Sequence, residues 1–109
     1  MTRSEVMDMM RETGVIFDEE HPDHITADKF LALEPPFMEY VLEDAPVIAD
    51  AIRYLDIKRL RINLYSDTEE TSAESAIEQV LDHEELRWRK EKEFIDEILM
   101  WNIVYTLEV

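Results

Sequence analysis

The sequence predicts an α+β domain, in which a mainly antiparallel sheet of four to five strands carries two helices packed on one face. Three observations predict it. Residues 58–65 alternate polar and apolar side chains, as a strand with one buried face does. Apolar residues then recur at spacings of three and four between positions 73 and 81, which is typical of an amphipathic helix. Residues 99–107 alternate again and are rich in β-branched and aromatic side chains.

The composition suits a single domain spanning residues 1–109. A hydrophobic content of 46% in 109 residues allows one modest core. The chain has no cysteine, which excludes disulfides and a cysteine nucleophile and fits a reducing compartment. No apolar run approaches the ~20 residues of a membrane span, and the acidic N-terminus does not resemble a signal peptide. We therefore expect a soluble protein of the cytoplasm without a membrane partner.

The first elements follow from capping residues and breakers. Thr2 and Glu5 have the spacing of a capping box, and Gly14 ends the apolar stripe, so a helix is expected over residues 3–13. Residues 15–17 favour a short strand. Thr26 can cap a short helix through position 33.

Two adjacent prolines then stop any helix, and residues 37–42 are predicted to form a strand. Its alternation places Met38, Tyr40 and Leu42 on one face. Residues 43–50 contain Pro46 and favour an exposed connection. The long strand described first is expected to begin at residue 51 or 52 and to end at residue 65.

The C-terminal third is predicted to complete the sheet. A helix is expected at about residues 69–82, followed by a strand at 86–89 with Leu86 and Trp88 facing inward. Residues 90–93 are all charged and favour a turn or hairpin tip. The last strand covers residues 99–107, and a helix beginning near Phe94 is the competing interpretation.

The charge is strongly unbalanced. The chain has 27 acidic and 11 basic residues and a formal net charge of -16, which should repel nucleic acid and anionic membranes. Eight of the basic residues lie between positions 53 and 92: Arg53, Lys58, Arg59, Arg61, Arg87, Arg89, Lys90 and Lys92. Such a mixed face suits contact with an acidic protein or with other copies of the chain, although an ordinary solvated face would have the same composition.

No pattern predicts catalysis. A single glycine excludes a phosphate-binding glycine loop, and there is no nucleophile elbow. His21, Asp23 and His24 are of metal-ligand type, but they lie in a loop-like acidic segment, and solvated side chains are the simpler interpretation. His83 falls near the end of a predicted helix, where it complements the helix dipole. We predict no enzyme activity, no cofactor and no metal site.

The order of several short patterns resembles a known family. They are Glu5-Val6, Thr13-Gly14, Pro35-Pro36-Phe37 with Tyr40 and Leu42, Ala49-Asp50 with Tyr54, Leu64-Tyr65-Ser66-Asp67 with Glu74, Val80-Leu81, and Tyr105-Thr106-Leu107-Glu108. Together they resemble the small tail-completion proteins, most closely the tail terminators, of long-tailed phages and prophages of Gram-positive bacteria. Members of this family often carry a glycine where this chain has Ala51, and another where it has Glu85-Leu86.

The resemblance implies a structural protein of the virion neck, assembled in the cytoplasm of the bacterial host. Tail terminators form a hexameric ring that caps the tail tube and joins it to the head connector, and DNA passes through the lumen without specific binding. An acidic lumen suits that passage. The resemblance further implies subunit contacts on the polar sheet face or the projecting strands, and the candidate interface residues are Arg59, Arg61, Tyr65, Arg87 and Arg89.

Three alternatives remain open at the level of sequence. The first is a neighbouring head-tail adaptor or stopper. The second is a small acidic inhibitor that mimics nucleic acid and occupies a basic cleft. The third is a metal-dependent enzyme that uses the loop from His21 to His24.

Overall fold

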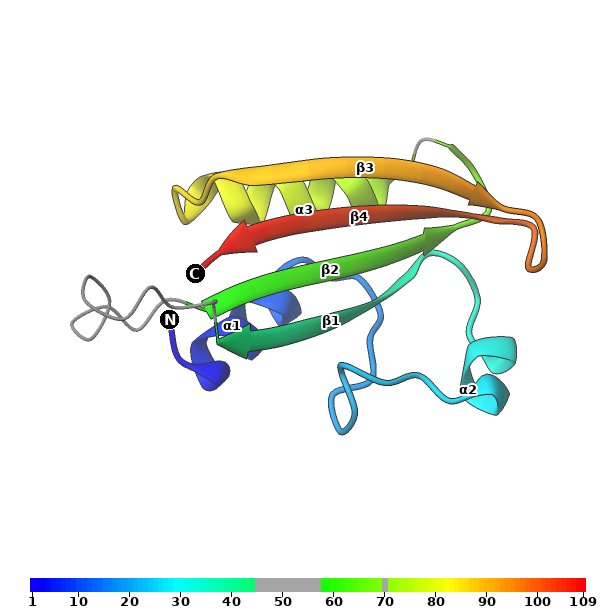
Figure 1. Ribbon diagram of the computed structural model, residues 1–109, viewed down its shortest axis with the longest axis horizontal. Helices are drawn as coiled ribbons and strands as arrows, with labels where there is room; N and C mark the ends of the chain where they lie inside the picture. Colours follow the sequence, from blue (N-terminus) through cyan, green and yellow to red (C-terminus); the bar gives the residue numbers. More distant parts are fainter. Residues whose placement is uncertain (45–57, 70) are drawn as a thin grey trace.

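The computed structural model describes residues 1–44, 58–69 and 71–109. The helices there are α1 (Arg3–Glu12), α2 (Ala27–Ala32) and α3 (Ser72–His83), and the strands are β1 (Phe37–Asp44), β2 (Lys58–Ser66), β3 (Trp88–Ile95) and β4 (Met100–Glu108). All three strand pairings are antiparallel, and the sheet has the order β1-β2-β4-β3 (Figure 1). The predicted α+β class and the predicted antiparallel sheet are confirmed.

The connection through α3 determines this strand order. β2 and β3 run in the same direction, because each of them pairs antiparallel with β4. Strands with a common direction need a crossover connection, and α3 supplies it. The chain then returns through a tight turn, so that β4 fills the position between β3 and β2. In Figure 1, α3 runs behind β3 and β4.

One face of the sheet, the core face, carries the hydrophobic core. Its buried residues are Met38, Tyr40 and Leu42 of β1, Leu60, Ile62 and Leu64 of β2, and Ile103, Tyr105 and Leu107 of β4. Val6, Met9 and Met10 of α1 and Ala73, Ile77 and Leu81 of α3 belong to the same cluster. The alternation predicted for the strands is therefore confirmed in all three.

Capping residues determine where the two longer helices, α1 and α3, begin. The Thr2 side chain accepts from the Glu5 backbone N–H while the Glu5 side chain accepts from the Thr2 N–H, so the predicted capping box begins α1. Gly14 follows the helix with φ 72°, a conformation that glycine adopts without a steric penalty. α3 begins three residues later than predicted, because Thr71 caps it by accepting from the Ala73 N–H.

The two edges of the sheet differ. The N–H groups of Met38 and Tyr40 on β1 donate to the carbonyls of Ile16 and Pro22 at 2.8 Å each, so the incoming chain covers this edge. The strand predicted at residues 15–17 is wrong as a strand, because only an isolated bridge joins Ile16 to Phe37. β3 forms the other edge, and its alternating lysines and glutamates protect it from pairing with another strand.

The predicted hairpin tip is wrong. Residues 90–93 lie inside β3, and the turn comes later, at residues 96–99, with Leu99 at φ 53°. The strand continues because Lys90 and Lys92 find carboxylate partners on α3, as described below. The helix considered near Phe94 is also wrong, since Phe94 belongs to β3 and pairs with Trp101. The connection predicted to begin at residue 43 begins later, because β1 continues to Asp44 and pairs there with Lys58. The rest of that connection and the predicted start of the long strand, residues 45–57, fall outside the described residues.

Candidate interaction surface

The outer face of the sheet, opposite to the core face, carries the other alternate residues of the same strands. Arg61 on β2 lies opposite Thr106 on β4, and Arg89 on β3 lies opposite the same threonine from the other side. In the next row, Arg59 lies between Glu43 of β1 and Glu108 of β4. The pleat and the register thus bring Arg59, Arg61 and Arg89 to one end of the outer face.

Arg87 precedes β3 at the same end of the sheet. Within the part of the chain that the structure describes, no ion pair joins any of these four arginines to a carboxylate. Glu43 and Glu108 are cross-strand neighbours of Arg59 but make no salt bridge with it. The four guanidinium groups are therefore available to an external anion or carboxylate.

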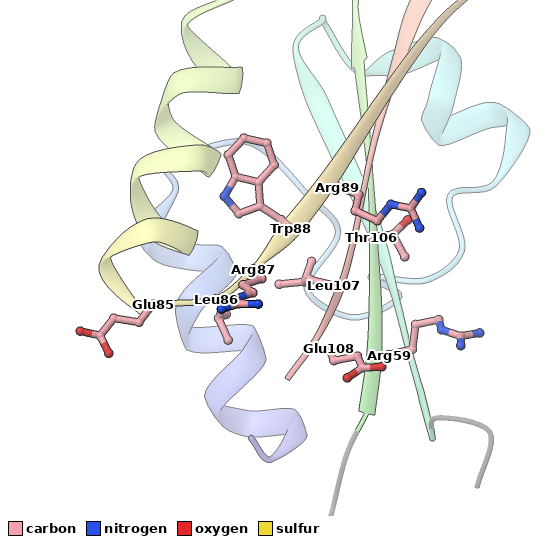
Figure 2. A pocket seen from close by; sticks show the side chains of 9 residues that line it. All are labelled: Arg59, Glu85, Leu86, Arg87, Trp88, Arg89, Thr106, Leu107 and Glu108. Carbon is pink, nitrogen blue, oxygen red and sulfur yellow. The ribbon is translucent and has the colours of Figure 1, made fainter. Parts of the chain in front are cut away.

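A groove of about 630 Å³ opens beside these arginines (Figure 2). Leu86, Trp88 and Leu107 provide its apolar lining, and Arg59, Arg87 and Arg89 its basic lining. Figure 2 shows Arg59 and Arg89 on the side of Thr106, while Trp88 points toward α3. Two carboxylates, Glu85 and Glu108, also border the groove. The groove combines apolar surface with an excess of positive charge, a composition that suits an acidic, partly apolar segment of protein.

Glu85 adopts a left-handed backbone conformation, with φ 58°. It lies directly after Glu84, the C-cap residue of α3, and the Leu86 N–H donates to the Leu81 carbonyl at 3.0 Å. Glycine is the usual residue at this position. The turn after α3 therefore has a backbone conformation typical of glycine, although the residue is a glutamate.

Tyr65 lies at the opposite end of the outer face from the arginines. Its ring stacks on Phe37 with centroids 5.4 Å apart, and Phe30 of α2 contacts both rings edge-on at 5.1 and 5.2 Å. Its hydroxyl donates to Glu39 at 3.1 Å. Burial, followed by the charge and hydrogen bond of Glu39, raises the pKa of Tyr65 to about 12. Tyr65 therefore belongs to an aromatic cluster with Phe30 and Phe37, although the charge of Arg61 still acts on its pKa and opposes part of the increase.

An ionic network on the core face was not predicted from the sequence. Lys90 Nζ lies 3.2 Å from Glu74 Oε2 and 3.0 Å from Glu78 Oε2, and Lys92 Nζ lies 3.0 Å from Glu74 Oε1. The Tyr105 hydroxyl donates to Glu78 at 2.8 Å. The sequence contained one signal for this network: two lysines lie two positions apart on a strand, and two glutamates lie four positions apart on the preceding helix.

The network fixes the protonation of its members. Burial by itself would lower the pKa of Lys90, but hydrogen bonds and charges from Glu78 and Glu74 outweigh burial and raise it. Burial raises the pKa of Tyr105 well above its usual range, and the hydrogen bond to Glu78 adds to the effect. Both groups therefore keep their protons at neutral pH, and their role is to tie β3 to α3.

The turn between β3 and β4 is the second feature that sequence reasoning missed. Leu99 is 72% exposed and Phe94 is 44% exposed, although both are large apolar side chains. Phe94 packs edge-on against Trp101 with centroids 5.4 Å apart. The exposure was hidden because Leu99 continues the alternation of β4 in sequence, whereas in the structure it belongs to the turn.

The described residues offer no site for metal chemistry. Among residues 1–44, 58–69 and 71–109, no three histidine or carboxylate side chains converge in a way that could hold a metal ion. His21, Asp23 and His24 are all exposed in their loop. No helix in the same ranges is both long and apolar enough to cross a membrane.

The fold and this surface define a small α+β domain with a polar outer sheet face. No protein-family model, curated protein or solved structure matches the chain.

Proposed function

We propose that the chain is a structural protein of a siphophage-type tail, the tail terminator, with no catalytic role. In this function it forms a hexameric ring that caps the tail tube and joins it to the head connector. The proposal rests on the ordered resemblance described above. The observation that carries it is the group of four arginines, without ion-pair partners in the described chain, at one end of the outer face of a protein with a net charge of -16.

An arginine surface on an acidic protein suits contact between copies. The attraction requires that the basic surface of one copy meets an acidic surface of the next, because two basic surfaces repel each other. Such a contact is heterologous, since the two surfaces differ, and a heterologous contact that closes produces a ring. The remaining acidic surface would then repel the DNA that passes through the lumen.

The acidic-inhibitor alternative has weaker support. A nucleic-acid mimic needs rows of free carboxylates on a rigid element. On α3, which contains three acidic residues and neither lysine nor arginine, Glu74 and Glu78 are engaged by lysines of β3. The third, Asp82, accepts from the Trp88 indole N–H at 2.9 Å. A head-side adaptor would share the proposed ring geometry and differs in its binding partner.

Electron microscopy tests the proposal. The protein is imaged alone and after mixing with assembled tail tubes of the same phage. Density that caps one end of the tubes, or six-fold rings, is the expected result. Protein that ignores the tubes but binds the isolated head connector would assign it to the head side. Protein that binds neither would contradict a role in the neck.

A further inference from the structure

The turn of the β3–β4 hairpin, called the tip and formed by residues 96–99, has features that the monomer does not need. Leu99 combines a left-handed backbone, φ 53°, with a side chain that is 72% exposed. Glycine or asparagine would adopt this backbone more easily and would expose no apolar surface. A left-handed backbone and an exposed apolar side chain thus coincide at Leu99, which makes the tip a candidate for contact with another molecule.

The tip is also acidic. Asp96 and Glu97 are exposed, and neither forms an ion pair with any residue in the described ranges. Next to them, Ile98 is half-buried and Leu99 is exposed. A surface that receives the tip must therefore offer apolar area beside positive charge.

The groove described above has this composition. Leu86 and Trp88, both half-buried, can receive an apolar side chain, while Arg87 and Arg89 are exposed at its border. Both arginines lack an ion-pair partner in the described chain. Tip and groove are thus complementary in hydrophobicity and in charge.

The tip and the groove lie at opposite ends of the same hairpin. β3 begins at the groove with Trp88 and ends with Ile95, just before the tip (Figure 1). Eight extended residues span roughly 25 Å, so a molecule cannot place the tip in its own groove. The complementary charges favour a second copy as the occupant, because every copy carries both an acidic tip and a basic groove, and the resulting contact is head-to-tail.

We propose that the tip of one copy docks in the groove of a second copy, with Leu99 against Leu86 and Trp88, and with Asp96 and Glu97 paired to Arg87 and Arg89. This inference rests on the proposed function, for which it names the contact between ring subunits. A head-to-tail contact leaves one free tip and one free groove on every open chain. Association therefore continues until a ring closes.

Sedimentation velocity of purified variants tests the contact. Leu99→Gly removes the apolar side chain and suits the local backbone, so the monomer stays folded. Arg87→Glu reverses a charge at the groove. Each variant is expected to weaken self-association by about tenfold or more. The matched controls are Ile16→Ala, at a 54% exposed residue outside the tip, and Arg3→Glu, an exposed arginine outside the groove; both should associate like the wild type.

Mixing the two variants supplies the sharper result. The Leu99→Gly protein retains a functional groove and the Arg87→Glu protein retains a functional tip, so the mixture should form one-to-one heterodimers and nothing larger. A wild type that stays monomeric at millimolar concentration would overturn the inference. Unchanged association in both variants, or a mixture that forms no heterodimer, would also overturn it.

The tail-tube experiment separates this inference from the proposed function. If both variants still cap the tubes with complete rings, the terminator function stands and the tip-to-groove contact is wrong. If the wild type associates through tip and groove but does not bind tubes, the contact stands and the terminator function is wrong.

Discussion

The two faces of the sheet consist of alternate residues of the same four strands, yet they have different roles. On the core face, Leu60, Ile62 and Leu64 of β2 are completely buried with the side chains of α1 and α3. On the outer face, Arg59 and Arg61 of the same strand find no ion-pair partner among the described residues. The core face therefore contains most of the hydrophobic core. The outer face is buried at the end where Phe30 covers Phe37 and Tyr65, and it exposes Arg61 and Arg89 toward the other end.

The same contrast holds for charged residues within β3. Lys90 and Lys92 point to the core face and are neutralised by Glu74 and Glu78 of α3. Arg89, the residue directly before Lys90, points to the outer face and has no such partner in the described chain. The environment of a basic residue on this strand thus alternates with the pleat.

The largest expected difference between the faces comes from truncating apolar residues. Ile62→Ala on the core face should lower the free energy of unfolding by about 2–5 kcal/mol, because it leaves a cavity among buried side chains. Val41→Ala on the half-buried outer face should cost less than about 1 kcal/mol. Urea denaturation followed by circular dichroism measures both. Equal losses would show that the outer face is also part of the stabilising core.

The ionic network should produce the next largest effect. Glu74→Ala leaves Lys90 and Lys92 without their shared partner, and we expect a loss of about 1–3 kcal/mol, moderated because both lysines are partly exposed. The control is Glu91→Ala, at an exposed glutamate on the outer side of β3, which should change stability by less than about 0.5 kcal/mol. A Glu74→Ala protein as stable as the control would mean that the network is energetically neutral.

Alkaline pH should reveal the buried hydroxyl of Tyr65. The pKa of Tyr65 is raised from 10.0 to about 12 in the folded state. The contribution of its protonated hydroxyl to the free energy of unfolding is therefore fully present below pH 10 and is lost as the pH rises to about 12. Two pKa units correspond to about 2.7 kcal/mol, and the partial exposure of Tyr65 to solvent reduces the expected loss to on the order of 1–2 kcal/mol. Tyr65→Phe should remove this part of the decrease in the free energy of unfolding at high pH, and the part due to Tyr105 should remain. Urea denaturation at several pH values measures the effect, and identical pH profiles would contradict it.

The smallest effect on stability is expected at the arginines. Arg61→Ala should change the free energy of unfolding by less than about 0.5 kcal/mol, because the side chain is exposed and makes no ion pair in the described structure. If the outer face is an interface between copies, the same substitution should weaken association in sedimentation experiments. A large loss of stability with unchanged association would reverse the roles assigned to the two faces.

The elements that sequence predicted well are those with strong local signals. The capping box at Thr2 and the alternation around Ile62 act through the geometry of neighbouring residues, and both appear as expected. The turn predicted at residues 90–93 was wrong because a run of charged residues resembles a turn whenever its partners are far away in sequence. Glu74 is 16 residues from Lys90, so only the packing of α3 on β3 could show that the lysines are neutralised.

The candidate surface was predicted in part. Arg59, Arg61 and Arg89 were expected on the polar side of strands, and the register of β2, β4 and β3 brings them to one end of the sheet. Tyr65 was grouped with them but lies in an aromatic cluster with Phe30 and Phe37. The apolar tip at Leu99 was not predicted, because its position depends on where β3 ends.

The sequence by itself determined which side chains share a strand face and where α1 begins, because these depend on the pleat and on a cap three residues away. Only the tertiary structure decided that the arginines adjoin one groove, that the lysines of β3 belong to the core face, and that the acidic tip lies at the far end of the same hairpin. The reason is physical: strand order and register are determined by contacts between residues distant in sequence, which no local pattern specifies.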